Sequence, residues 1–146
     1  MCVQYLTTAN TDWVKNHFDL DLPASAAHDV FPTYPGPIVL KSHNTGRTAI
    51  GLARFGLIPS WAKDEDFGRK TYNARAETVS EKPSYKNAWS KRHYALTLAD
   101  MFYEPCYESG KAVRTGIKQA NGQPMAIASI WDTWTRSEER RVGREC

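Results

Sequence analysis

The sequence predicts an α+β fold, in which a bent, barrel-like and mostly antiparallel β-sheet is accompanied by a few short helices. Many short strand-like stretches recur along the chain, and they are separated by turn signals such as Asn44-Thr45-Gly46 and Asn121-Gly122. Helical patterns are confined to two short segments. The length of 146 residues suffices for one domain with a real core, but not for two domains. Together these observations favour a sheet with helices around it.

The first helix is expected close to the N-terminus. Thr11 or Asn10 can cap it, and one face of it carries Trp13, Val14, His17 and Phe18. Pro23 ends that region. Residues 31–37 contain three prolines, so we expect an ordered loop there without regular structure.

A β-hairpin is expected next. Residues 38–40 begin its first strand, and a long second strand is predicted over 48–58. Gly51 and Gly56 interrupt the alternation of the second strand, which suggests bends or bulges. Residues 59–72 then form a polar loop that carries aromatic and basic side chains.

The second half of the chain combines one helix with further strands. Pro83 suits the first turn of a helix that runs to about Arg92, and its Tyr85 and Trp89 share a face that we expect in the core. The further extended segments are predicted at 94–98, 102–104, 111–118 and 125–131. Gly110 marks a turn before the third of them, and Asn121-Gly122 is a two-residue hairpin turn before the fourth.

Composition excludes several classes of protein. Hydrophobic content of 41% and charged content of 24% are ordinary for a globular domain, and no run of 18 apolar residues predicts a membrane span. The first twenty residues lack the pattern of a secretory signal. Three cysteines, Cys2, Cys106 and Cys146, have no close spacing and predict neither a disulfide framework nor a zinc site. A reducing, cytoplasmic compartment is therefore expected.

Positive charge is concentrated in the middle of the chain. The net charge is +3, but residues 41–92 carry eleven Lys or Arg against five acids, a balance of +6, and aromatic residues lie among them. Such a region attracts polyanions by releasing their counterions, as single-stranded nucleic acid binders do. A well-solvated basic face is the alternative interpretation.

Cys2 directly follows the initiator methionine. If Met1 is removed, Cys2 carries a thiol and a free α-amine on adjacent carbons, and this pair can condense with an aldehyde to an imine and then a thiazolidine ring. Ordinary pKa values of about 8 for both groups leave each partly deprotonated near neutral pH. A cysteine that lies by chance at a frayed terminus is the alternative.

Four sequence blocks occur in a fixed order along the chain: Met1-Cys2, Gly56-Leu57-Ile58-Pro59-Ser60-Trp61-Ala62-Lys63, Asn73-Ala74-Arg75-Ala76-Glu77-Thr78 and Ala99-Asp100-Met101-Phe102-Tyr103-Glu104. In sequence and spacing this series resembles the SOS-response-associated peptidase (SRAP) family, from Cys2 to about Thr135. The resemblance implies a monomeric protein of the DNA damage response that removes its own Met1. It further implies that Cys2 bonds covalently to abasic sites in single-stranded DNA, without cofactor, metal or membrane.

The resemblance also implies a set of catalytic residues: Cys2 as the nucleophile, Asn73 as an active-site amide and Glu104 as a carboxylate that moves protons. On residue chemistry alone, Asn73 can instead be a turn residue that bonds its own backbone, and Glu104 a solvent-facing acid at a strand end. Arg75 lies two residues after Asn73, so an extended backbone places both on one side; its alternative is an ion pair with Glu77.

The DNA-binding candidates include Arg75, whose guanidinium suits phosphate. Trp61 and Pro35 are candidates for stacking in a DNA groove, and a tryptophan in the core is the alternative for Trp61. Lys63 and Arg54 are phosphate candidates on charge alone.

The sequence departs from the family pattern in several places. Val3 and Gln4 stand where the family has Gly and Arg, and Pro105 stands where Trp is common. The family chain continues beyond Thr135 and carries its catalytic histidine there, so this chain is expected to be truncated. We expect residues 1–135 to form the domain and residues 136–146 to be a charged tail outside it. The four histidines match no family position and are expected at the surface or as caps: His17, His28, His43 and His93.

Three other functions remain open from the sequence. The first is a thiol peptidase or amidohydrolase that uses Cys2 as an ordinary thiolate, which needs a base such as histidine within reach. The second is a non-catalytic binder of single-stranded DNA. The third is a fragment that has no function.

Overall fold

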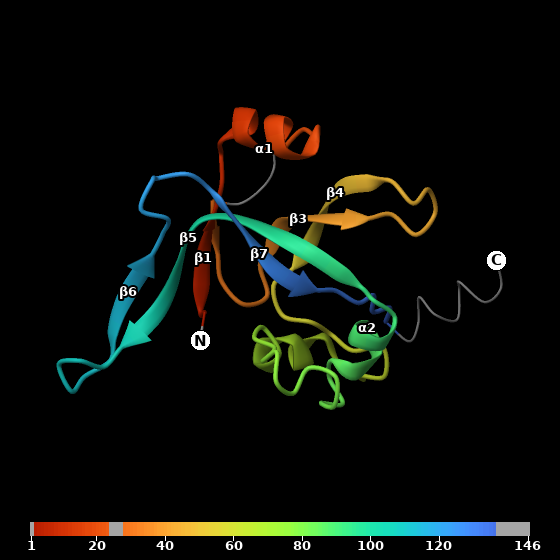
Figure 1. Ribbon diagram of the computed structural model, residues 1–146. Coiled ribbons are helices and arrows are strands. Elements are labelled where there is room, and N and C mark those ends of the chain that lie inside the picture. The colour runs from red at the N-terminus through yellow and green to blue at the C-terminus, as the bar shows by residue number, and fades with distance from the viewer. Residues whose placement is uncertain (1, 24–27, 137–146) are drawn as a thin grey trace.

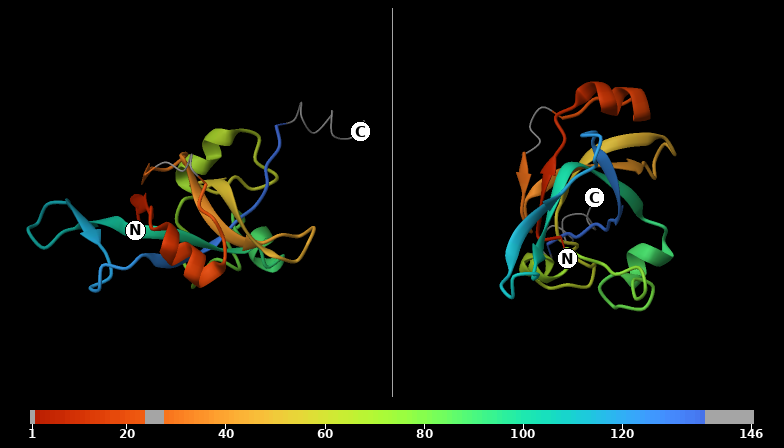
Figure 2. Two further views of the ribbon diagram at one scale, coloured as in Figure 1. Left: turned by 90° about the horizontal axis from the view of Figure 1, so that it is seen from above. Right: turned by 60° about the vertical axis from the view of Figure 1, so that its left-hand side comes forward.

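The computed structural model describes residues 2–23 and 28–136. It shows one seven-stranded antiparallel sheet that curls into a half-barrel, with short helices around it (Figures 1 and 2). The strands are β1 (Gln4–Thr7), β2 (Asp29–Val30), β3 (Pro35–Lys41), β4 (Thr48–Arg54), β5 (Tyr94–Cys106), β6 (Val113–Ile117) and β7 (Met125–Ile130). The predicted α+β class and the bent antiparallel sheet are confirmed.

Strand β5, which is thirteen residues long, is the centre of the sheet. At Phe102 it pairs with β1 and β6, at Ala95 with β3 and β7, and at Ala99 with β1 and β7. Because two partners of one residue lie on opposite edges, β1 and β3 follow one another along one edge of β5, and β6 and β7 along the other. Beyond β7, the far end of β5 and β6 project as an arm (Figure 1).

A β-bulge interrupts the pairing of β1 with β5. Leu6 pairs with Met101, but Thr7 pairs with Ala99, so Asp100 is an extra residue of β5 without a partner on β1. An extra residue changes which face the following side chains occupy.

The core shows this change of face. Leu98 packs with Val14 and Val39, whereas Ala99 packs with Tyr5 and with Phe102. Ala99 and Phe102 are three positions apart, and regular alternation would send them to opposite faces. Glu104, two residues beyond Phe102, therefore belongs to the face of β5 that carries Tyr5 and not to the face under Val14.

Helix α1 (Thr11–Phe18) covers the outer face of the sheet (Figure 1). The side chain of Asn10 accepts a hydrogen bond of 3.0 Å from the backbone N–H of Trp13, which confirms the predicted cap. Val14 is fully buried, and Trp13 and Phe18 pack around the same cluster.

The hairpin of β3 and β4 differs from the prediction. The turn at 44–46 is confirmed, but β3 already begins at Pro35, inside the segment expected to lack regular structure. Pro35 and Pro37 occupy alternate positions, so their missing N–H groups fall on one edge, and β5 pairs along β3 only from Ile38. The ladder runs unbroken through Gly51, so of the bend or bulge predicted at this glycine the bulge is wrong.

Strand β4 ends at Arg54 and not at residue 58. Gly56 has a φ of +118°, outside the extended region, which confirms a bend at this glycine. The following loop, predicted to be irregular, contains a 3₁₀ helix, η1 (Glu65–Lys70), which Asp64 caps through the backbone N–H of Asp66 at 2.8 Å.

The second half of the chain requires three corrections. The two extended segments predicted at 94–98 and 102–104 are one strand, β5. The turn at Asn121-Gly122 exists but closes no hairpin, because β6 and β7 both pair with β5. Helix α2 (Lys86–Ser90) is shorter than predicted, and although Tyr85 is buried, Trp89 is 40% exposed. None of the described helices is long and apolar enough to cross a membrane.

Candidate functional site

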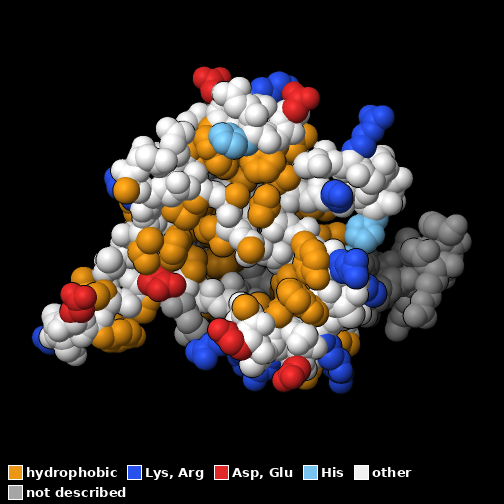
Figure 3. Space-filling view, viewed as in Figure 1, with side chains coloured by type: hydrophobic (Ala, Val, Ile, Leu, Met, Phe, Trp, Pro, Cys, Tyr) orange, Lys and Arg blue, Asp and Glu red, His pale blue; other side chains and the backbone are white. Residues whose placement is uncertain are grey.

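An open groove of about 1280 Å³ runs along the concave side of the sheet. Figure 3 shows the hollow, with hydrophobic side chains gathered around it. The groove is lined by β-strand residues from one side and by the loops after β4 and before α2 from the other. Among its lining residues are the three predicted catalytic side chains, Cys2, Asn73 and Glu104.

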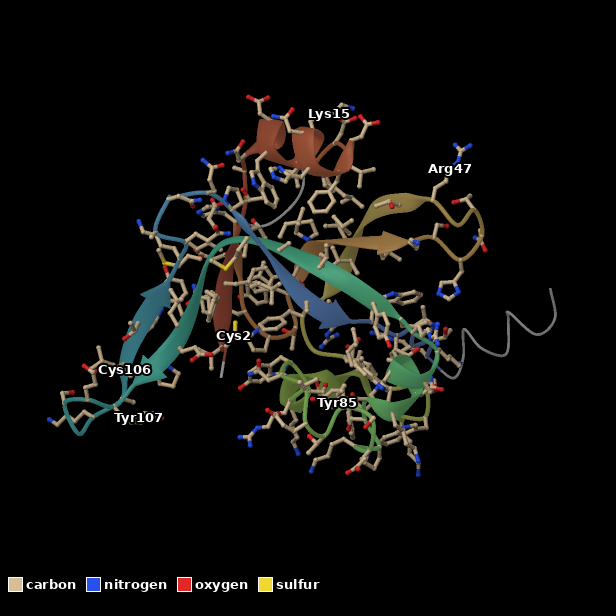
Figure 4. All side chains as sticks on the ribbon, viewed as in Figure 1. Cys2, Lys15, Arg47, Tyr85, Cys106 and Tyr107 are labelled. Carbon is tan, nitrogen blue, oxygen red and sulfur yellow. The ribbon has the colours of Figure 1, made fainter. Side chains whose placement is uncertain are left out.

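Cys2 reaches the groove because β1 is held in register with β5. Gln4 pairs with Tyr103, and the N–H of Val3 donates to the carbonyl of Tyr103 at 3.1 Å. The half-buried Cys2 thiol donates to the Gln4 carbonyl at 3.4 Å. Cys106 lies on the arm, apart from Cys2 (Figure 4).

Asn73 joins the N-terminus to the loop that faces it. Its Nδ2 donates a hydrogen bond of 2.8 Å to the carbonyl of Cys2, 71 residues away in the sequence. The alternative of a turn residue that bonds its own backbone is therefore wrong for this side chain. The carbonyl of Asn73 accepts a second bond of 2.8 Å from the hydroxyl of Tyr85.

Glu104 acts electrostatically on Cys2. Burial raises the pKa of the Cys2 thiol, and the Glu104 carboxylate raises this pKa as well. Hydrogen bonding with the backbone of Gln4 and Tyr103 opposes the rise without cancelling it. The thiol is thus protonated near neutral pH, which is unlike a cysteine activated as a free thiolate.

Of the two arginines that line the groove, Arg54 forms an ion pair and Arg75 forms none within the described residues. Arg75 is exposed, and its side chain forms no ion pair within the described part of the chain, so the alternative of an ion pair with Glu77 is wrong. Arg54 instead pairs with Glu65 at 3.5 Å, and Glu65 also pairs with Arg136 at 3.2 Å. Arg75 is consequently the more available cation.

The remaining DNA-binding candidates lie outside the groove lining. Trp61 is 54% exposed, so the core alternative is wrong; its indole N–H donates to the carbonyl of Pro83 at 3.3 Å, and its ring meets Phe67 edge-on. Lys63 is exposed in the same loop, and Pro35 is exposed at the start of β3.

The histidines are not part of this site. No described histidine lines the groove. His93 was expected at the surface or as a cap, but it is buried, with its ring stacked on Trp131 at 4.1 Å. Burial lowers the pKa of His93, although Asp132 opposes this shift. In the described part of the chain, no three His, Cys, Asp or Glu side chains gather as metal ligands would.

Sequence reasoning missed two polar contacts. Tyr85 was assigned to the core for its ring, and nothing in its sequence neighbourhood indicated that its hydroxyl bonds Asn73. Gln4 is buried and donates to Asp29 at 3.1 Å, so it joins β1 to β2 and does not face the groove. The side chain that departs from the family pattern at position 4 therefore links two strands and does not line the groove.

Fold and site together define a class of protein: a curled antiparallel half-barrel that presents the cysteine at position 2 in a groove beside an asparagine and a glutamate. The family "SOS response associated peptidase (SRAP)" matches residues 1–145. The chain belongs to this family.

Individual relatives agree with this assignment. Abasic site processing protein YoqW of Bacillus subtilis (strain 168) is 35% identical over 143 residues, which cover 94% of this chain and 63% of YoqW. Abasic site processing protein HMCES of Xenopus tropicalis is 37% identical over 114 residues, 64% of this chain and 34% of that protein. The chain thus spans less than two thirds of the length of these relatives.

Solved structures confirm the fold. A protein from Bordetella bronchiseptica superposes with a TM-score of 0.79 at 30% identity, over 94% of this chain and 66% of that one. A protein from Bacteroides thetaiotaomicron gives a TM-score of 0.75 over 94% and 63%; at 22% identity this likeness concerns the fold alone.

Proposed function

We propose that this protein captures abasic sites in single-stranded DNA through Cys2 after hydrolytic removal of Met1, as part of the response to DNA damage. The observation that carries the proposal is the 2.8 Å bond from Asn73 to the Cys2 carbonyl, which holds the second residue of the chain in a groove shared with Glu104. The names of the relatives, abasic site processing proteins, support the choice of substrate. Met1 lies outside the described residues, so its removal is part of the proposal.

The proposed reaction joins the α-amine and the thiol to one aldehyde carbon. The amine of Cys2 attacks the ring-opened aldehyde of the abasic deoxyribose and gives a carbinolamine. Loss of one water then gives an imine. The thiol adds to the imine carbon, its proton passes to the nitrogen, and a thiazolidine ring results. In total one water is released, and no oxidant or reductant is needed.

The groove contains a side chain for proton transfer and another for orienting the amine, as these reaction steps require. Departure of the carbinolamine hydroxyl as water requires a proton, and the Glu104 carboxyl is the acid–base side chain whose charge Cys2 senses. Asn73 fixes the Cys2 backbone and so orients its amine. A protonated thiol suits this order of steps, because the amine attacks first and the sulfur second.

DNA binding is proposed to centre on Arg75, which is exposed on the groove and free of ion pairs within the described residues. Its guanidinium suits a phosphate next to the lesion. The parts of the DNA strand outside the groove would then contact Trp61, Lys63 and Pro35. Stacking of the exposed indole on a base contributes about 1–3 kcal/mol to binding. Arg54 would have to leave Glu65 before it could contact DNA.

The test of the proposal is the intact mass of the protein after mixing with a single strand that carries one abasic site. The expected product has the mass of the chain without methionine, plus the DNA strand, minus one water, and it survives denaturing electrophoresis. Equal non-covalent binding of intact and abasic strands, with steep salt dependence, would instead indicate a simple DNA binder. A thiol peptidase needs a thiolate and a nearby base, but the pKa of the Cys2 thiol is raised and no described histidine lines the groove.

Substitution of Glu104 by glutamine should change two reactions of Cys2 in opposite directions. Loss of the neighbouring negative charge lowers the pKa of the thiol, so labelling of Cys2 by iodoacetamide at pH 7 should become faster. Loss of the acid should slow capture of abasic DNA by about 100-fold. Peptide mass spectrometry measures the first rate and gel-resolved crosslinking the second.

The matched control is Glu108→Gln, because Glu108 is an exposed acid at the tip of the arm. It should leave both rates unchanged. If Glu104→Gln slows labelling and capture together, the carboxylate has a structural role and the proton-transfer assignment is wrong.

A further inference from the structure

Tyr85 is connected to the proposed reaction centre by two consecutive hydrogen bonds. Its hydroxyl donates to the backbone carbonyl of Asn73 at 2.8 Å, and Nδ2 of Asn73 donates to the carbonyl of Cys2, also at 2.8 Å. Tyr85 itself lines the groove (Figure 4). Through these bonds the beginning of α2 is linked to the N-terminal residue that carries the chemistry.

The Asn73 segment depends on this link because the backbone gives it little other support. Backbone hydrogen bonds stop at Thr71, whose carbonyl accepts from Leu57 at 3.2 Å, and resume at Arg75, whose carbonyl accepts from Thr78 at 3.1 Å. Among the described residues, no backbone–backbone hydrogen bond involves residues 72–74. The hydrogen bond from the Tyr85 hydroxyl therefore holds the backbone of Asn73 from outside residues 72–74.

Tyr85 is itself held firmly. It is 9% exposed, its N–H donates to the Lys82 carbonyl at 2.9 Å, and its carbonyl accepts from Trp89 at 2.9 Å. Burial raises the pKa of the Tyr85 hydroxyl, so this group keeps its proton and remains a donor at neutral and moderately alkaline pH. A carbonyl acceptor requires a donor of this kind.

We propose that Tyr85 is a positioning residue for abasic-site capture, which acts through Asn73 to hold the Cys2 amine in its reactive orientation. This inference rests on the proposed function of Cys2. Tyr85 need not touch the DNA; its effect is to restrict the backbone of Asn73 so that the amide reaches the Cys2 carbonyl. A single buried hydrogen bond of this kind is worth a rate factor of roughly five.

A double-mutant cycle tests the proposal. Tyr85→Phe removes only the hydroxyl, and the rate of crosslinking to an abasic single strand under single-turnover conditions should fall roughly fivefold. In an Asn73→Ala background the same change should alter the rate by less than about twofold, because the amide that Tyr85 positions is gone. The matched control is Tyr107→Phe, since Tyr107 is 65% exposed and does not line the groove; it should keep the wild-type rate.

Two results would overturn the inference: an unchanged rate for Tyr85→Phe, or an equal loss in both backgrounds, which a general effect on folding would produce. Hydrogen exchange separates this failure from failure of the proposed function. In Tyr85→Phe, peptides that cover Asn73 and the N-terminus should exchange faster, whether or not the wild type crosslinks DNA. Absence of any wild-type crosslink would refute the capture reaction, whereas unchanged exchange in Tyr85→Phe would refute the role of Tyr85.

Discussion

The Cys2→Ala variant is expected to lose the adduct with abasic DNA that survives denaturing electrophoresis. The rate of stable capture should fall on the order of 100-fold or more. Alanine keeps the α-amine but lacks the sulfur that closes the ring, so a reversible imine would be the furthest point of the reaction. Denaturing electrophoresis of protein mixed with a labelled abasic strand measures the outcome. Trapping with borohydride should recover the imine from Cys2→Ala if its amine is correctly held.

The matched control is Cys106→Ala. Cys106 is also a half-buried free cysteine, but it lies at the far end of β5, paired with Val113 on the arm. This variant should crosslink at the wild-type rate. A loss of crosslinking in Cys106→Ala with retention in Cys2→Ala would move the reaction to the arm and contradict the assignment.

The Gly56→Ala variant should be destabilised by about 3 kcal/mol or more, the largest effect on stability that we predict for a single methyl group. Gly56 has a φ of +118°, which L-residues rarely adopt, and an added Cβ would overlap the backbone oxygen of Gly68. Backbone cannot move aside as a flexible side chain can. Because this crossing closes the loop that leads to Asn73, loss of the crosslink should accompany loss of stability; urea unfolding measures the latter.

Gly51→Ala provides the control for Gly56→Ala. Gly51 lies in β4, and an added Cβ would meet only the Leu40 side chain at 3.8 Å, an ordinary contact. Its stability should stay within about 1 kcal/mol of the wild type, with a small gain from the less flexible unfolded chain. Equal urea midpoints for the two variants would show that the crossing of Gly56 and Gly68 is not a constraint.

Much of the fold was predictable because its local signals are strong. Asn10 as a cap, the turn at 44–46 and the bend at Gly56 each follow from the chemistry of one or two residues. The errors concern long-range pairing. The continuity of β5 and the start of β3 at Pro35 depend on which strands lie alongside, and local propensity carries no information about that.

The candidate site shows the same division. The resemblance indicated Cys2, Asn73 and Glu104, and the structure brings all three to one groove. Tyr85 was missed as a partner of Asn73, because the sequence does not tell a tyrosine that only buries its ring from one whose hydroxyl also donates a hydrogen bond. His93 was misassigned since its burial results from Trp131, which is distant in the sequence.

The extra residue in β5 has a consequence for the acid of the site. Alternation along a strand has a phase, and Asp100 shifts that phase by one step between the hydrophobic half of β5 and the half that carries Glu104. A chain without Asp100 would keep Phe102-Tyr103-Glu104 yet turn the carboxylate of Glu104 towards the convex side of the sheet. The orientation of Glu104 is thus determined four positions upstream, by a residue that never enters the groove.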